Sequence, residues 1–233
     1  MRNAMLTLKT TLKTVTSGTV GSILKPALFA VLMWTASAAG AVPIPGTPVP
    51  ITLQTFVVML AALMLPWKQA GAAMLMYLAK PYLKENAQIL DPCCGVGTML
   101  IERDILVPAR EKYGIDIFGD AIDMARENAA LAGEKINFIH RDYFDFKHDY
   151  KFDEIVTNMP VKGKKAKEDM DAFYARFFEK SKSLLAEDGI IIMYSNEVGF
   201  VKKQLRLQPC YRLIQEYTIR KKDSYCLFII GMK

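Results

Sequence analysis

The chain has 233 residues, which allows one or two domains, and 52% of them are hydrophobic, enough to build a core. The formal net charge is +6, yet no acidic residue precedes Glu85, and from there onward 23 basic residues stand against 24 acidic ones. The excess charge therefore lies in the first third, which excludes a globally basic nucleic-acid binder and indicates a membrane-proximal N-terminus.

An uncharged run of 42 residues, 26–67, dominates that first third. Four prolines and a glycine between residues 43 and 50 divide it into two apolar stretches of 17 residues each, 26–42 and 51–67. A membrane span needs roughly 17–25 residues. Because Lys25 and Lys68 flank the run, the positive-inside rule predicts a helical hairpin, 26–70, in the cytoplasmic membrane, with both ends cytoplasmic and a basic segment, 1–25, before it.

Two other interpretations of this run stay open. The first stretch has the basic flank, the apolar centre and the small residues, 36–41, of a signal peptide. Both stretches could instead be buried helices of a soluble domain. A core helix normally keeps a polar face, however, and this run contains no charge at all.

The segment PIPGTPVPITLQTFVVMLAALMLPW, 43–67, resembles the start of the substrate-binding component of bacterial biotin transporters. The resemblance covers about residues 20–80 and includes the Pro-rich turn and the PVPITLQT entry into a second span. It implies a membrane location. That family continues into further spans that complete its ligand pocket, whereas charged sequence follows here, so this remnant is not expected to enclose biotin.

From Glu85 onward, short apolar runs alternate with amphipathic segments. Strands are predicted at 88–92, 113–117, 136–140, 152–157 and 189–195, with a closing hairpin of strands 211–219 and 224–231. Helices are predicted after the glycine turn at 91–98, at 120–132 and at 167–187. This alternation predicts an α/β domain, 73–233, with a mostly parallel, doubly wound sheet of seven strands and an antiparallel C-terminal pair.

The glycine turn DPCCGVGT is the first candidate ligand-binding element along the chain. Gly95 and Gly97 would let the backbone approach a ligand that a Cβ would block. A P-loop would need a Gly-Lys-Ser/Thr ending, and a dinucleotide fingerprint would need a third glycine where Leu100 stands. The turn by itself is equally explained by close packing of a strand against a helix.

Acidic residues at the next strand ends suggest a nucleoside. Asp116 ends the second strand, 19 residues after Gly97, where a carboxylate can accept both ribose hydroxyls. Asp142 lies just past the third strand, over the same sheet edge, and could accept from an adenine amine. Adenine and ribose without a phosphate site favour S-adenosylmethionine over NAD. Either acid alone could be a helix cap or a solvated carboxylate, but successive strand ends favour one shared site.

The fourth strand ends in Asn158-Met159-Pro160. A rigid turn of this kind can hold a planar amine, since the Asn oxygen and a backbone carbonyl each accept one N–H and leave the lone pair facing a methyl donor. No general base is needed, because the proton can leave after transfer. An ordinary turn at the end of a strand is the alternative.

The motifs DPCCGVGTMLIE, YGIDI, MARENAALAG, RDYFDF and TNMP occur in the order of class I methyltransferases. Over residues 72–233 they most resemble the RNA methylases usually attached to THUMP domains. The resemblance implies a Rossmann-like fold, S-adenosylmethionine as cofactor, and an exocyclic amine of guanine or adenine in tRNA or rRNA as target. It implies that the cofactor is bound by Asp91, Cys93, Gly95, Gly97, Thr98, Asp116 and Asp142, and the target amine by Asn158, Met159 and Pro160.

The chain departs from that family in two places. The family pattern is Asn or Asp, Pro, Pro, then Tyr or Phe, but Met159 replaces the first Pro and Val161 replaces the aromatic residue, so a base-stacking contact would be missing. No THUMP-like region precedes the domain, and a transporter-like hairpin stands in its place. A cluster of four lysines within 162–167 could contact phosphates or could be a solvated loop.

The sequence therefore predicts a cytoplasmic S-adenosylmethionine-dependent methyltransferase of RNA on a membrane hairpin, without a metal site. The alternative is a truncated transport component fused to an inactive or substrate-blind methyltransferase domain. A protein amine or a small molecule is also open as acceptor, and the sequence indicates no oligomeric state.

Overall fold

The computed structural model describes residues 41–42, 51–52, 67–161, 169–220 and 225–233. The chain divides into two compact units, Met1–Gly71 and Ala72–Lys233. In the first unit, β1 (Ala41–Val42) and β2 (Ile51–Thr52) pair antiparallel, with Ala41 opposite Thr52. These four residues fall within the two stretches predicted to be helical, 26–42 and 51–67, and they form strand there instead.

Most of the predicted membrane hairpin lies outside the described residues, as do the four lysines within 162–167 and the predicted hairpin turn at 221–223. Among the helices that the structure does describe, none combines the length and the apolar character that a bilayer crossing requires.

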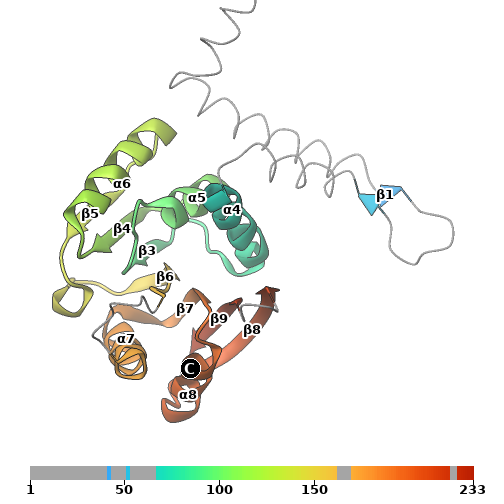
Figure 1. Cartoon of the computed structure of the whole chain (residues 1–233), viewed down its shortest axis with the longest axis vertical. Helices are drawn as coiled ribbons and strands as arrows, with labels where there is room; N and C mark the ends of the chain where they lie inside the picture. Colours follow the sequence, from blue (N-terminus) through green and yellow to red (C-terminus); the bar gives the residue numbers. More distant parts are fainter. Residues whose placement is uncertain (1–40, 43–50, 53–66, 162–168, 221–224) are drawn as a thin grey trace, which may run out of the picture. The chain divides into compact units, whose positions relative to one another are not determined.

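In the second unit, seven strands form one mixed sheet (Figure 1). Their order is β5-β4-β3-β6-β7-β9-β8; the strands from β5 to β7 run parallel, and β9 runs antiparallel to both its neighbours. The strands are β3 (Gln88–Asp91), β4 (Glu111–Asp116), β5 (Asn137–His140), β6 (Phe152–Asn158), β7 (Leu185–Ser195), β8 (Tyr211–Arg220) and β9 (Tyr225–Met232).

Helices cover both faces of this sheet (Figure 1). One face packs against α4 (Trp67–Ala79) from Ala72 onward, α5 (Thr98–Leu106) and α6 (Gly119–Ala132). The other face packs against α7 (Met170–Leu184) and α8 (Val198–Leu207). Two 3-10 turns, η1 (Lys80–Tyr82) and η2 (Tyr143–Asp145), lie in the connections. The arrangement is that of a doubly wound α/β domain.

The seven-stranded sheet and its antiparallel C-terminal pair confirm the predicted α/β fold. The helix predicted at 167–187 spans Met170–Leu184 instead, because Asp169 caps its first turn by accepting the Asp171 N–H at 3.0 Å and β7 begins at Leu185. Helix α8 is absent from the predicted elements. Its second residue is a glycine and only Val201 and Gln204 are buried on it, so the sequence offers little helical periodicity there.

Candidate functional site

The candidate site lies at the carboxyl edge of the sheet, beside β3. From β3 the chain continues to β4 and β5 on one side and then crosses to β6 on the other. In doubly wound sheets, ligands bind in the crevice at such a switch point. Asp91 is the last residue of β3, Asp116 of β4 and Asn158 of β6, while Asp142 follows β5 by two residues. The structure thus brings the predicted carboxylates and Asn158 to one edge.

The two glycines of the turn have different surroundings. Both have positive φ angles, 51° for Gly95 and 81° for Gly97. A Cβ on Gly97 would lie 2.8 Å from the ring of Phe138, so close packing alone requires this glycine. A Cβ on Gly95 would meet nothing within 4 Å, so the turn opens on free space there. Gly95 is therefore the glycine that a ligand can approach, and the turn leads directly into α5 at Thr98.

Two backbone amides orient the Asp116 carboxylate. Its Oδ2 accepts the Gly95 N–H at 2.8 Å, and its Oδ1 accepts the Phe118 N–H at 3.0 Å. A carboxylate has about four acceptor sites, so each oxygen can accept one further hydrogen bond. Asp116 is half-buried, which leaves these sites accessible to a pair of hydroxyls. The carboxylate is fixed before any ligand arrives.

Asp91 is a buried carboxyl with an unsatisfied oxygen. Its side chain is 1% exposed, and its Oδ1 accepts the Cys93 N–H at 3.1 Å. Its Oδ2 and the buried Thr157 hydroxyl on the adjacent strand form no complete hydrogen bond among the described residues, although the two groups interact weakly and Thr157 lowers the pKa of Asp91 a little. Burial, together with the nearby charge of Asp116, raises the pKa of Asp91 to about 8. A cationic group at this position would stabilise the charged form and give Oδ2 a partner.

The adjacent cysteines are not suited to nucleophilic chemistry. Burial and the carboxylate of Asp91 raise the pKa of both the Cys93 and the Cys94 thiols, so both stay protonated near neutral pH. Cys94 has a structural role, because its N–H donates to the Ile115 carbonyl at 2.9 Å and joins the turn to β4. Half-buried Cys93 lies close to three carboxylates of the edge, Asp91, Asp116 and Asp142.

The Asp142 carboxylate both caps η2 and faces solvent. Its Oδ1 accepts the Phe144 N–H at 2.9 Å, and the side chain is exposed. Two apolar side chains that the sequence prediction missed follow Asp116: Ile117 is 56% exposed and Phe118 is 67% exposed. The sequence signal for them was two apolar residues directly after an acid that ends a strand. Apolar side chains at such a place can face the planar ring of a ligand.

The three residues of the predicted amine-binding turn lie in different environments. Asn158 is exposed at the end of β6, and Pro160 is exposed beyond it. Met159 is 3% exposed and packs into the core between the sheet and α7, while its N–H donates to the Tyr194 carbonyl at 2.9 Å. The Met159 side chain therefore does not face the edge, and only its backbone can contribute there. Val161, by contrast, is 52% exposed.

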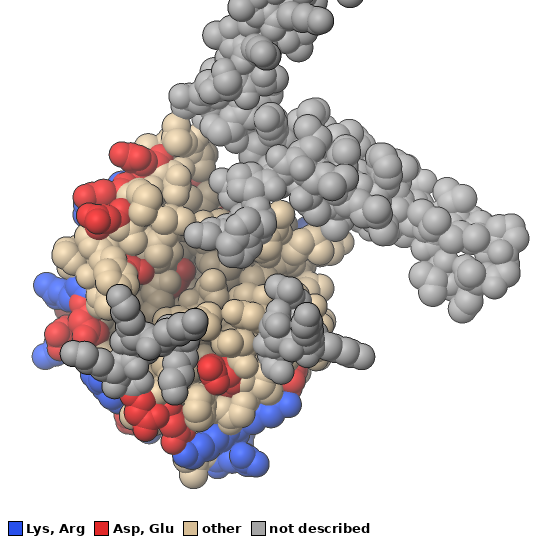
Figure 2. Space-filling model, in the orientation of Figure 1, with Lys and Arg blue, Asp and Glu red and all other residues tan. Residues whose placement is uncertain are grey.

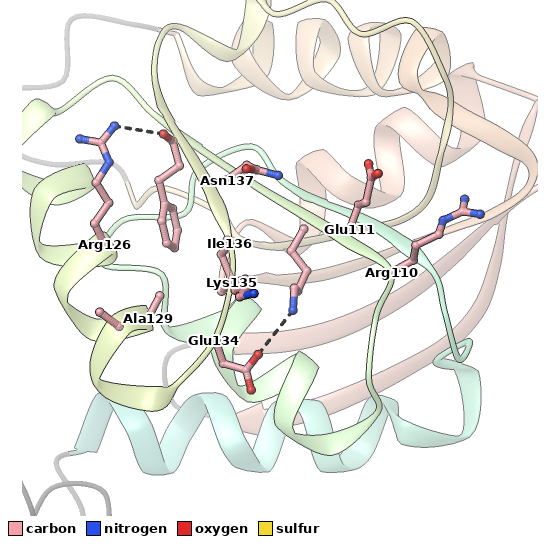
Figure 3. A pocket seen from close by; sticks show the side chains of 11 residues that line it. Arg110, Glu111, Arg126, Ala129, Glu134, Lys135, Ile136 and Asn137 are labelled. Atoms are coloured by element: carbon pink, nitrogen blue, oxygen red, sulfur yellow. Dashed lines mark hydrogen bonds and ion pairs between the residues drawn. The ribbon is translucent and has the colours of Figure 1, made fainter.

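A separate pocket of about 460 Å³ lies beside the beginnings of β4 and β5 and the end of α6 (Figure 3). Its charges are largely satisfied within the protein: Lys112 pairs with Glu134 at 3.4 Å and also with Asp104, and Arg126 donates to the Phe138 carbonyl at 3.2 Å. The carboxylate of Asp104 raises the pKa of Glu134 to about 7. The charged residues around this pocket form a structural ion network at the other end of the strands. None of the predicted site residues lines the pocket.

Two family profiles match adjoining parts of the chain. The profile described as the BioY family matches residues 7–82, and the profile described as the methyltransferase small domain matches residues 68–223, more than half of the chain. They overlap at 68–82, which comprises most of α4 and all of η1. Both resemblances inferred from the sequence are thereby confirmed.

Several known proteins are similar to this chain over much of its length. The tRNA (guanine(10)-N2)-dimethyltransferase of Methanothermobacter thermautotrophicus is 34% identical over 145 residues, which are 61% of this chain and 42% of that protein. The structure of TrmN from Thermus thermophilus is similar with a TM-score of 0.60 and 23% identity, covering 81% of this chain and 55% of that one. SMU.776, solved in complex with SAH, gives a TM-score of 0.59 at 12% identity, covering 72% and 50%. This chain thus spans about half the length of these proteins.

Proposed function

The chain belongs to the methyltransferase small domain family, and we propose that it transfers a methyl group from S-adenosylmethionine to an exocyclic amine of a base in tRNA or rRNA. One observation carries the proposal. The Asp116 carboxylate, held by two amides beside the open space at Gly95, shares the sheet edge with the unsatisfied Asp91 oxygen and with exposed Asn158.

The residues at this edge fit the cofactor group by group. The ribose hydroxyls would donate to the free acceptor sites of Asp116, and the adenine amine to Asp142. The ammonium of the methionine part is a cation, which suits the buried Asp91 carboxyl, whose Oδ2 forms no complete hydrogen bond among the described residues. When bound, the cofactor supplies an electrophilic methyl group on a positively charged sulfur. Cys93 and Thr98 complete the proposed lining around the turn.

The turn after β6 would position the amine. The Asn158 side-chain oxygen and a backbone carbonyl of the turn accept its two N–H groups, which directs its lone pair toward the methyl group. The Met159 N–H bond to Tyr194 holds this backbone rigid. Positive charge develops on the amine as the new bond forms, and these two acceptors stabilise it. The proton then leaves to solvent.

An RNA acceptor is supported by the tRNA-directed activity that the Methanothermobacter relative is named for. Figure 2 shows Lys and Arg along the lower and left borders of the face it presents, interspersed with acidic side chains rather than forming one basic surface. Phosphate contacts along such a face would be few, so we expect recognition to depend on the base itself.

Methyl transfer from labelled S-adenosylmethionine tests the proposal, with total RNA compared against total protein as acceptor. We expect label in RNA. Asp116→Ala should weaken cofactor affinity at least tenfold, because it removes hydrogen bonds to a charged acceptor that contribute roughly 1.5–3 kcal/mol each. Glu127→Ala, an exposed acid on α6, is the matched control. Label in protein alone would exclude the RNA acceptor, and equal affinity of wild type and Asp116→Ala would remove Asp116 from the site.

The BioY match supports a membrane-bound form of the enzyme. In that arrangement a basic segment, 1–25, precedes a membrane hairpin, 26–70, and the methyltransferase domain, 73–233, lies on the cytoplasmic side. Carbonate extraction of membranes tests this location. Release of the intact chain would favour buried soluble helices, and a shortened N-terminus would favour a signal peptide.

A further inference from the structure

A stacked pair of tyrosines stands next to Asn158 at the carboxyl edge. The rings of Tyr194 in β7 and Tyr225 in β9 have centroids 5.1 Å apart and planes inclined by 22°. The strand register places Tyr194 directly beside Asn158 of β6. It also pairs Tyr194 with Leu227, so Tyr225 is the diagonal neighbour of Tyr194, a position that aromatic side chains can reach.

Asn158, Tyr194 and Tyr225 project from the same face of the sheet. Side chains alternate along a strand, so residues two apart share a face. Val156, Ile192 and Leu227 all pack in the core beneath α4, α5 and α6, and each lies two residues from one of the three. Since β7 lies between β6 and β9, the Tyr194 ring stands between Asn158 and Tyr225. Asn158 is exposed, so a ligand can reach its side chain from solvent.

We propose that the Tyr194–Tyr225 pair is the stacking platform for the acceptor base, in place of the aromatic residue that position 161 lacks. The inference rests on the proposed function, because it concerns the base whose amine Asn158 would hold. That base would lie over β6 against the Tyr194 face opposite Tyr225 and so extend the stack. Both tyrosines are half-buried, so neither is closed off from solvent.

The platform is mechanically joined to the amine-binding turn. The Tyr194 carbonyl accepts the Met159 N–H at 2.9 Å, so the residue that carries the ring and the turn after Asn158 move together. Tyr225 supports the far side of the Tyr194 ring and limits its rotation. Stacking requires an exposed base face, which paired duplex does not offer. The substrate class is therefore a purine in a single-stranded or looped-out part of the RNA.

Leucine and phenylalanine substitutions in the full-length chain separate stacking from packing. Tyr194→Leu and Tyr225→Leu remove the ring, whereas Tyr194→Phe and Tyr225→Phe keep it. Tyr217→Leu is the matched control, since Tyr217 is half-buried against the same core but stands on β8, three strands from Asn158. The readouts are kcat/KM for methyl transfer to RNA, the affinity of a single-stranded purine oligonucleotide by fluorescence anisotropy, and cofactor affinity by calorimetry.

We expect Tyr194→Leu to lower oligonucleotide affinity and kcat/KM by about 5- to 150-fold, and both Phe variants to stay within about threefold of wild type. Cofactor affinity should not change, and Tyr217→Leu should leave RNA binding intact. Equal RNA affinity of the Leu and Phe variants would overturn the platform. Methylation of RNA by the wild type would still support the proposed function in that case. If wild type methylated no RNA, the proposed function would fail, and oligonucleotide binding would still decide the platform. An equal loss of RNA affinity in Tyr217→Leu would mean that the tyrosines act only through core packing, and it would also overturn the platform.

Discussion

Arg103 of α5 and Glu154 of β6 form a fully buried, two-pronged ion pair. Arg103 Nε donates to Oε2 at 2.7 Å and Nη2 donates to Oε1 at 2.8 Å, and both side chains are 0% exposed. Lys84 joins them, because its N–H donates to Glu154 at 2.7 Å and its carbonyl accepts from Arg103 at 2.7 Å. The pair therefore anchors the beginning of the same strand that ends in Asn158.

Glu154→Gln should lower the free energy of unfolding by about 3–5 kcal/mol, because it leaves the Arg103 charge buried without its counter-ion. Urea unfolding followed by circular dichroism measures the change. Asp123→Asn is the control: it breaks the exposed pair of Asp123 with Arg126 and should stay within about 1 kcal/mol of wild type. A Glu154→Gln variant as stable as Asp123→Asn would mean that solvent reaches the Arg103 guanidinium.

This ion pair shows where prediction from the sequence stops. Strand and helix types follow from local periodicity, and the acids at strand ends follow from the rule that parallel strands end at one edge. Arg103 and Glu154 are 51 residues apart, and they meet only because α5 packs across β3 and β6. The sequence shows two ordinary charged residues there. The Tyr194–Tyr225 stack is hidden for the same reason, since it depends on β9 pairing with β7.

The pH dependence of stability should report the buried Asp91 carboxyl. Its pKa is raised in the folded chain to about 8 from 3.8, so the folded state holds a proton that the unfolded state has lost across this range. The stability that Asp91 contributes is then fully present below about pH 4 and is lost as the pH rises toward 8. The pKa values of Glu102 and Glu134 are raised to about 7, so both act in the same direction, mainly below that pH.

Between pH 7 and 8 the decline due to Asp91 should be about 1 kcal/mol, and Asp91→Asn should remove it. Urea unfolding at closely spaced pH values measures the slope, and Glu102→Gln, which should keep most of this slope, is the control. Identical slopes for wild type and Asp91→Asn would mean that Asp91 is already ionised in the free protein.

The two glycines of the turn should respond differently to alanine. Gly97→Ala places a Cβ 2.8 Å from the Phe138 ring at a positive φ, and should cost about 2–4 kcal/mol of stability from overpacking and backbone strain. Gly95→Ala meets no atom within 4 Å and should cost only about 1 kcal/mol, but should weaken cofactor binding. Thermal unfolding and calorimetry separate the two effects. Phe138→Leu should partly rescue Gly97→Ala, and the absence of rescue would remove Phe138 as the cause.

Val161→Tyr restores the aromatic residue of the related methylases at an exposed position. Because the side chain is 52% exposed, stability should change little. A second ring near the acceptor should leave methyl transfer to RNA unchanged or raise it, with up to about 1–3 kcal/mol available from stacking. Val161→Ser, which adds no ring, is the control. Loss of RNA methylation in Val161→Tyr alone would show that the base does not lie beside this turn.

Asn158→Ala should lower turnover by about 10²-fold or more, the scale of losing one preorganised polar contact to developing charge. Cofactor affinity should stay nearly unchanged, since Asn158 is proposed to hold the amine and not the cofactor. Met159→Leu is the matched control, because the Met159 side chain is 3% exposed in the core and its backbone N–H bond to Tyr194 would persist. It should keep wild-type turnover. Single-turnover kinetics with saturating cofactor, beside calorimetry, measures both quantities. If Asn158→Ala weakened cofactor binding as much as turnover, the turn would belong to the cofactor site instead of the acceptor site.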